Sequence, residues 1–277
     1  MLRIDAHQHF WKFDAIRDSW INEEMKAIQR DFLPADLLPV LKQNGIDGSV
    51  AVQADQSLDE TKFLLELSNN NDFIKGVVGW VNLQAVDIEE QLQELSRNKK
   101  LKGFRHILQG ERDVEYMMRP LFLRGINYLR RFNFTYDLLI HPRHLPIAIQ
   151  IVQLFPAQRF VIDHLAKPMI KEHKLKGWEK DMKAIGQFEN VFCKISGMVT
   201  EADWKQWKEE DFTPYLNVIF STFGSSRVMF GSDWPVCLVA ASYEKMLTIV
   251  QDYTRNFTPG EQLAFWGGNA ISFYNLT

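Results

Sequence analysis

Residues 227–233 read Arg-Val-Met-Phe-Gly-Ser-Asp, an apolar run that ends in a carboxylate. Seven further runs of similar length are spaced along the chain, and most of them are rich in Val, Ile and Phe. Short apolar runs of this kind are typical of strands buried on both faces, as in parallel sheets. The eight runs cover residues 3–9, 48–54, 75–83, 102–108, 135–141, 159–165, 191–197 and 227–233.

The segments between the runs are long enough for the crossover helices that parallel strands require. Helical periodicity is visible at 58–67, 117–132 and 147–155, and a capping box at Thr258 predicts a last helix that ends near Tyr274. Eight strand–helix units are compatible with a closed (β/α)8 TIM barrel or an open doubly wound sheet. We favour the α/β barrel because eight strands close a ring and because no Gly-x-Gly-x-x-Gly turn follows any run. We expect residues 1–277 to form a single domain.

The composition excludes several classes of protein. The chain has 277 residues, 46% of them apolar, and a formal charge of −3 from 32 basic and 35 acidic residues. Such a chain is not disordered, and it lacks the basic surplus typical of nucleic-acid binders. No apolar run reaches the roughly 18 residues of a membrane span, and the first residues show no signal-peptide core. Two cysteines, Cys193 and Cys237, cannot form a disulfide framework, so we expect a cytoplasmic protein with buried, inert thiols.

Polar side chains stand at the carboxyl ends of the runs, which in a barrel meet at one mouth. His7 and His9 are two residues apart, so both imidazoles point to the same face of a strand, the lumen of a barrel. Asp233 ends the last run, and a carboxylate facing a closed lumen is costly unless it is paired or hydrated. We therefore expect these three residues to converge in one cavity. The other candidates at strand ends are Arg105, His106, His141, Asp163, His164, Lys194 and Ser196.

Five motifs in this order resemble the amidohydrolase superfamily. More narrowly, they resemble the amidohydrolase-2 group of sugar lactonases and 2-pyrone-4,6-dicarboxylate lactonases, and within it the L-fuconolactone and L-rhamnonolactone hydrolases. The resemblance extends from residue 3 to about residue 275 and implies a (β/α)8 barrel of the metal-dependent-hydrolase type. The motifs are Ile4-Asp5-Ala6-His7-Gln8-His9-Phe10-Trp11, Lys102-Gly103-Phe104-Arg105-His106, Asp163-His164-Leu165-Ala166-Lys167-Pro168, Lys194-Ile195-Ser196-Gly197 and Phe230-Gly231-Ser232-Asp233-Trp234-Pro235.

The superfamily pattern implies a set of metal ligands at positions that this sequence matches. On the fourth strand the pattern has a bridging lysine or glutamate, whereas this chain has Arg105-His106, and arginine is not a ligand. We therefore expect one metal at most, either Zn²⁺ or Mn²⁺ with an open position for water. The resemblance to the dicarboxylate lactonases also allows a site without metal, and both interpretations stay open here. The implied ligands are His7, His9, His141, His164 and Asp233.

The reaction we expect is the opening of a sugar-acid lactone by water. Asp233 takes the proton from water, and burial is expected to raise the pKa of this carboxyl group. His7, His9 and His164 polarise the ring carbonyl and stabilise the oxyanion. For two of the residues expected to contact the substrate, Arg105 and Lys194, a buried ion pair that braces the barrel is the alternative. The expected substrate contacts are Arg105, His106, Lys194, His141, Trp80 and Gln53.

Two other functions remain open from the sequence. One is a metal-dependent, non-oxidative decarboxylase, because the same superfamily contains such enzymes with histidines and aspartates at strand ends. The other is a sugar-binding barrel without catalytic activity, which the His7/His9 pair and Asp233 disfavour. The partner we expect in each case is a small sugar acid, its lactone or another carboxylated molecule, and not a nucleic acid or a membrane.

Overall fold

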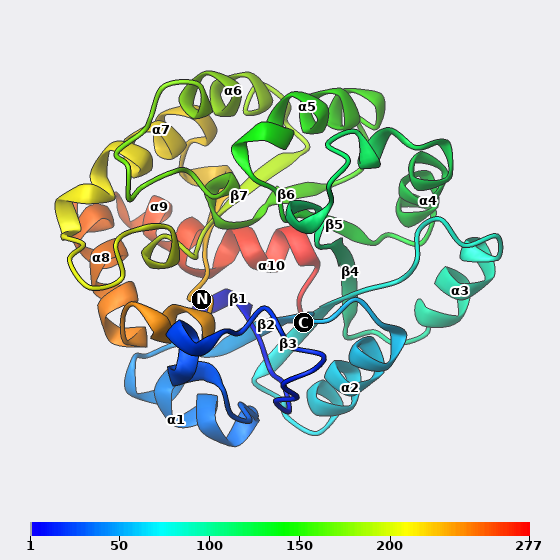
Figure 1. Ribbon diagram of the computed structural model, residues 1–277, viewed down its shortest axis with the longest axis horizontal. Helices are drawn as coiled ribbons and strands as arrows, with labels where there is room; N and C mark the ends of the chain where they lie inside the picture. Colours follow the sequence, from blue (N-terminus) through cyan, green and yellow to red (C-terminus); the bar gives the residue numbers. More distant parts are fainter. Residues whose placement is uncertain (1) are drawn as a thin grey trace.

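The computed structural model describes residues 2–277 and consists of a ring of eight parallel strands surrounded by helices (Figure 1). Each strand is hydrogen-bonded to the next one along the chain, and each overlaps the apolar run from which it was predicted. The prediction of a (β/α)8 barrel is confirmed. The strands are β1 (Ile4–Gln8), β2 (Gly48–Val52), β3 (Ile74–Gly79), β4 (Leu101–His106), β5 (Thr135–Leu138), β6 (Phe160–Ile162), β7 (Val191–Ile195) and β8 (Val228–Phe230).

The first and last strands complete the ring at the carboxyl ends of the barrel. Gln8 forms an isolated parallel bridge with Trp234, four residues beyond the end of β8. The amide of His9 donates to the carbonyl of Trp234 at 2.7 Å, and the amide of Asp233 donates to the carbonyl of His7 at 2.8 Å. The contact that closes the barrel therefore also sets the histidine pair beside Asp233.

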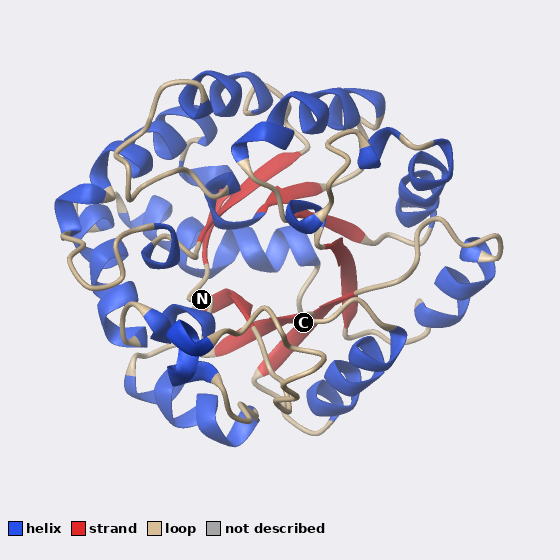
Figure 2. Ribbon diagram, in the orientation of Figure 1, coloured by secondary structure: helices blue, strands red, loops and turns tan. Residues whose placement is uncertain are grey.

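The helices form the outer layer, and one helix follows each strand (Figure 2). Their sequences explain this position: α4, for example, buries Phe122, Ile126 and Leu129, which share one face at helical spacing. The helices predicted at 58–67, 117–132 and 147–155 are confirmed as α2, α4 and α5. The outer helices are α1 (Pro34–Gln43), α2 (Leu58–Asn69), α3 (Ile88–Leu95), α4 (Pro120–Arg131), α5 (Leu145–Leu154), α6 (Trp178–Ile185), α7 (Thr213–Phe223) and α8 (Tyr243–Thr254).

Two further expectations concern the thiols and the membrane. Cys193 and Cys237 are both buried and both free, so the prediction of buried thiols is confirmed. Burial raises the pKa of the Cys237 thiol well above its ordinary value, which keeps it protonated and unreactive. Within residues 2–277, no helix combines the length and the apolar character needed to cross a bilayer.

The chain ends in a continuous helical segment that begins at the predicted capping box. The amide of Thr258 donates to the Glu261 carboxylate at 2.9 Å, and the amide of Glu261 donates to the Thr258 hydroxyl at 3.4 Å. From there α9 (Pro259–Leu263), one π turn (Ala264–Gly268) and α10 (Asn269–Tyr274) follow without a break. The predicted helix and its end at Tyr274 are confirmed.

The last helix, α10, crosses the ring of strands (Figure 1) and closes the end of the barrel opposite the mouth. Phe273 and Tyr274 are fully buried in a cluster with strand residues of the lumen, among them Val50 and Val161. Arg159, which precedes β6, donates to the carbonyl of Phe273 at 2.6 Å. This apolar layer forms the floor of the barrel, and the polar side chains lie above it.

Truncation of a large side chain in this apolar floor should destabilise the barrel. We expect Phe273→Ala to lower the free energy of unfolding by about 3–5 kcal/mol, because it removes a large buried side chain and leaves a cavity. Urea unfolding followed by circular dichroism measures the change. Leu121→Ala is the control, because Leu121 is 47% exposed on α4 and its truncation should cost less than about 0.5 kcal/mol. Equal losses in the two variants would contradict this role of α10.

Candidate functional site

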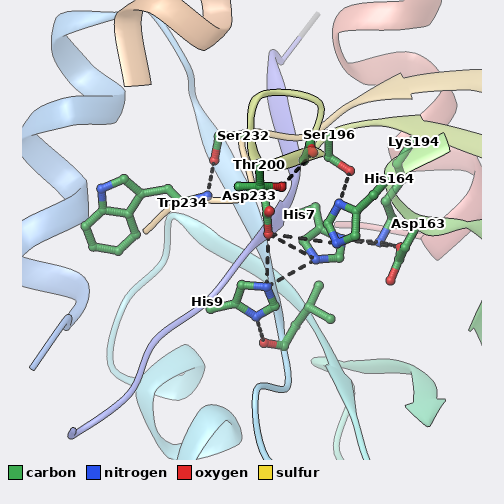
Figure 3. A network of polar contacts seen from close by, with 12 residues as sticks. His7, His9, Asp163, His164, Lys194, Ser196, Thr200, Ser232, Asp233 and Trp234 are labelled. Carbon is green, nitrogen blue, oxygen red and sulfur yellow. Dashed lines mark hydrogen bonds and ion pairs between the residues drawn. The ribbon is translucent and has the colours of Figure 1, made fainter. Parts of the chain in front are cut away.

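Three imidazoles and one carboxylate converge at the mouth of the barrel (Figure 3). The Nε2 atom of His9 lies 3.2 Å from Nε2 of His7 and 3.3 Å from Oδ1 of Asp233. The Nε2 atoms of His7 and His164 each lie 3.9 Å from the same carboxylate oxygen. All four side chains are buried. The residues expected to converge, from the beginning and the end of the chain, thus share one centre.

The outer nitrogens of two of these histidines are held by neighbouring strands. Nδ1 of His9 lies 2.7 Å from the carbonyl oxygen of Val52. Because a carbonyl only accepts, this Nδ1 carries a proton that it donates. Nδ1 of His164 lies 2.8 Å from the hydroxyl of Ser196 on the segment after β7. Both rings are therefore oriented so that Nε2 faces Asp233.

Several residues of the site have a left-handed backbone conformation, which residues other than glycine rarely adopt. His164, Leu165, Ala166 and Lys167 have φ between +51° and +58°, and Asp233 has φ +59°. Each left-handed residue of this kind costs roughly 1–2 kcal/mol. Such conformations persist where the surrounding structure requires them, and they concentrate at functional sites. They explain why β6 and β8 end before His164 and Asp233.

Two glycines allow the histidines to pack closely. A Cβ atom on Gly197 would lie 2.6 Å from Nδ1 of His164, and one on Gly231 would lie 2.7 Å from Cβ of His7. Real Cβ atoms do not approach other atoms so closely, so only glycine fits at either position. Gly197 also has φ +59°, a value that favours glycine.

A layer of paired charges lies in the lumen between the apolar floor and the histidines. Lys194 is fully buried, and its Nζ lies 2.6 Å from Asp137, 3.0 Å from Asp163 and 3.1 Å from Nδ1 of His7. Arg105 lies 3.0 Å from Asp163 and 3.2 Å from Nε2 of His7. For both Lys194 and Arg105, the sequence left two interpretations open, a contact with substrate and a buried ion pair that braces the barrel. These contacts agree with the buried ion pair.

Sequence reasoning did not assign a role to the two aspartates of this layer. Asp137 is completely buried, and burial raises its pKa to about 6 against the opposing charge of Lys194. Burial also disfavours the charged form of Asp163, but Lys194, His7 and Arg105 together hold the pKa of this carboxyl well below its ordinary value. Each of these two aspartates is a charged residue inside an otherwise apolar run, and a buried charge requires a partner of opposite sign. This pattern is the signal in the sequence that could have identified them.

The expectation that burial raises the pKa of Asp233 is wrong. Burial does act in that direction, but His164, His9 and Lys167 outweigh it and lower the pKa of Asp233 below its ordinary value. Burial also keeps the pKa of His7 and His164 well below the usual range. The lowered pKa of Asp233 keeps its carboxylate ionised at neutral pH.

The other expected substrate contacts occupy different environments. His141 lies at the mouth, outside the four-residue centre, in the wall of a cavity of about 940 Å³ that Lys167, Thr200, Glu201 and Trp204 also line. Burial, Lys167 and Arg143 lower the pKa of His141 to about 4.

The side chains of Trp80, His106 and Gln53 are engaged with other protein groups. Nε2 of His106 lies 2.8 Å from Glu111, and Nε1 of Trp80 donates to Nδ1 of His106 at 3.4 Å. Gln53 is fully buried and donates to the carbonyl of Arg105 at 3.1 Å. Their contact with substrate stays a prediction.

The donor set fits one divalent metal ion. Possible ligand atoms of His7, His164 and Asp233 all lie within 4.8 Å of one another, as three protein ligands with an open fourth position require. Nε2 of His9 faces the Asp233 carboxylate across 3.3 Å, and a proton or cation between them would remove the repulsion of their lone pairs. His141 is outside this set. Arg105, whose guanidinium cannot serve as a metal ligand, lies 3.2 Å from Nε2 of His7.

This fold and site define a class of protein, the closed (β/α)8 barrels with a histidine in β1 and another just after it, a histidine after β6 and an aspartate after β8. The model of the Amidohydrolase family Amidohydro_2 matches residues 4–276, and the chain belongs to this family. The family expected from the five sequence motifs is thereby confirmed.

Comparison with individual proteins adds to the family assignment. An L-fucono-1,5-lactonase of Burkholderia multivorans is 38% identical over 99% of this chain and 96% of its own length. The solved structure of an amidohydrolase from Burkholderia multivorans with bound zinc covers both chains completely at 38% identity, with a TM-score of 0.97. A 2,6-dihydroxybenzoate decarboxylase from Rhizobium covers 99% of both chains with a TM-score of 0.73, but at 12% identity it shows the fold alone.

The geometry predicts a single metal-binding position. We expect calorimetric titration of the metal-free protein with Zn²⁺ to give one equivalent, and His164→Gln to weaken the affinity at least about 10-fold because one of three ligands is lost. His173→Gln is the control, because the His173 side chain is 68% exposed and lies outside the centre. Binding of two equivalents, or the same loss in both variants, would contradict this ligand set.

Proposed function

We propose that this chain hydrolyses the ring ester of a sugar-acid lactone, with L-fucono-1,5-lactone as the first substrate to test. The observation that carries the proposal is the convergence of the Asp233 carboxylate with three imidazoles at the mouth of the barrel, at distances of 3.3 to 3.9 Å. The similarity to a lactonase over nearly the whole chain supports the substrate class. A cavity of about 940 Å³, large enough for a monosaccharide lactone, lies at the same mouth between the loops after β5, β6 and β7, and none of the four residues of the centre lines it.

Asp233 acts as the general base. Its pKa is low, so the carboxylate is ionised at neutral pH and is always ready to accept a proton, although it is a weak base. Oδ1 accepts one proton from water while the water oxygen bonds to the ring carbonyl carbon. Collapse of the tetrahedral intermediate then breaks the bond to the ring oxygen. Asp233 returns the proton to this alkoxide, which leaves a free hydroxyl and a carboxylic acid, and the acid releases its remaining proton to solvent as it becomes a carboxylate.

The histidines divide the remaining tasks. His9 donates from Nδ1 to Val52, and its Nε2 lies 3.3 Å from Oδ1 of Asp233. This nitrogen is suited to hold the attacking water and to share the proton that Asp233 takes. His7 and His164 face the same centre from the other side and orient the carbonyl oxygen of the substrate. A Zn²⁺ ion held by His7, His164 and Asp233 would supply Lewis-acid polarisation of that oxygen.

The alternatives have less support. The decarboxylase is similar in fold alone, and no feature of this site favours loss of CO₂ over attack on an ester. A sugar-binding barrel without activity would have no need of an ionised carboxylate among imidazoles in a strained backbone. A cytoplasmic location and the absence of nucleic-acid and membrane partners stay predictions from the composition.

Removal of the base should abolish turnover but preserve the fold. We expect Asp233→Asn to lower kcat for L-fucono-1,5-lactone by about 10²–10⁴, because a positioned proton acceptor is lost. A pH-indicator assay measures acid release, and a parallel assay for CO₂ should detect none. Asp252→Asn, on the exposed face of α8, serves as the control with unchanged kcat. Near-normal turnover by Asp233→Asn would exclude this base, and CO₂ release without ring opening would favour the decarboxylase.

The close packing of His164 on Gly197 gives an independent test. Gly197→Ala places a methyl group 2.6 Å from the ring of His164, so we expect kcat to fall at least about 10-fold as the ring is displaced. Gly224→Ala is the matched control, because Gly224 has φ +65° but no atom nearer than 4.0 Å to such a methyl group. Both variants place a side chain at positive φ, and Gly224, with ψ 179°, has a backbone conformation that is essentially confined to glycine. Equal kcat values in the two variants would show that the position of His164 is not critical.

A further inference from the structure

An ion pair in the wall of the mouth cavity contacts no reacting atom in the mechanism described above, where Lys167 acts only as one of the groups that lower the pKa of Asp233. Nζ of Lys167 lies 3.2 Å from Oε1 of Glu201, and the two side chains are 18% and 21% exposed. Both residues line the cavity of about 940 Å³, together with His141 and Thr200. The pair is therefore neither fully buried as a structural bridge nor fully solvated on the surface.

Lys167 ends the strained turn after β6 that contains His164. The amide of Lys167 donates to the carbonyl of His164 at 2.7 Å, which is an i to i+3 hydrogen bond. The row of left-handed residues from His164 to Lys167 thus connects the backbone of Lys167 directly to that of a histidine of the centre.

Glu201 is fixed in the facing loop by contacts of its own. It ends the 3-10 turn Val199–Glu201 after β7, and its carbonyl accepts from the amide of Lys171 at 3.0 Å. The neighbouring Thr200 hydroxyl donates to the carbonyl of Gly197 at 2.7 Å, and Gly197 packs against His164. Both members of the pair are therefore anchored to the two segments that hold His164.

We propose that Lys167 and Glu201 bind two neighbouring hydroxyl groups of the substrate and select for polyhydroxylated lactones. The proposal rests on the function proposed above. Neighbouring sugar hydroxyls are about one hydrogen-bond length apart, close to the 3.2 Å between Nζ and Oε1. One hydroxyl donates to the carboxylate, and the next accepts from the ammonium, which keeps further protons to donate. Hydrogen bonds to charged groups of this kind are the stronger ones.

A second ion pair in the same loops provides a matched control. Nζ of Lys171 lies 3.6 Å from Oδ2 of Asp203, and these side chains are 60% and 40% exposed. They belong to the same two loops as Lys167 and Glu201 and line the outer part of the same cavity, but they are much more solvated. Neutral substitutions in this outer pair change the charge of the mouth in the same way without removing the inner pair.

The test compares Lys167→Met and Glu201→Gln with Lys171→Met and Asp203→Asn. We expect the first two variants to raise KM for L-fucono-1,5-lactone about 10- to 100-fold with kcat within about threefold, and to weaken binding of L-fuconate in calorimetry in parallel. Their affinity for δ-valerolactone, which has no ring hydroxyl, measured as substrate or competitor, should change less than about threefold. Zn²⁺ affinity and the thermal unfolding midpoint should match those of the outer-pair variants.

The outcomes separate this inference from the proposed function. If the unsubstituted protein opens no lactone, the proposed function is overturned, and the L-fuconate titrations still decide whether the pair binds hydroxyl groups. If the protein opens L-fucono-1,5-lactone but the inner-pair variants keep its KM, the inference is overturned alone. Equal losses for δ-valerolactone, or equal losses in the outer-pair variants, would likewise overturn it.

Discussion

The hydrogen bond from the amide of Asp233 to the carbonyl of His7 joins the last strand of the barrel to the first. With the reciprocal bond from His9 to Trp234, it fixes the register between β1 and the segment after β8. A shift of one residue would turn the side chains of His7 and His9 from the lumen to the outer face. The same two hydrogen bonds therefore close the barrel and assemble the site, and they bring together residues more than 220 positions apart in the chain.

The charged layer below the histidines makes this arrangement rigid. Two cations, Arg105 and Lys194, and two carboxylates, Asp137 and Asp163, are enclosed where an unpaired charge would be strongly destabilising. Each of these charged groups therefore stays in contact with its partners. His7 lies within 3.3 Å of Arg105, Lys194 and Asp163. Tyr274 extends the network to the floor of the barrel by donating to Asp137 at 2.8 Å. The lumen thus supports the mouth from below.

The sequence determined the fold more completely than the site. Buried parallel strands leave a signal in every run, because residues of both faces must be apolar, and all eight runs appear as strands. The pairings of side chains across the lumen leave no such signal, since Lys194 and Asp137 are 57 residues apart. The direction of the Asp233 pKa depends on His164, His9 and Lys167 around it, and so the expectation based on burial alone was wrong.

The left-handed residues explain why two strands, β6 and β8, are shorter than the apolar runs predicted. Apolar runs predicted β6 and β8 to extend through His164 and Asp233, but the chain turns sharply before both residues. A regular strand would alternate its side chains between lumen and helix layer, so Asp163 and His164 could not both face inward. The turn allows Asp163 to face the buried cations while His164 faces Asp233. The strain is therefore the cost of placing two consecutive polar residues in one lumen.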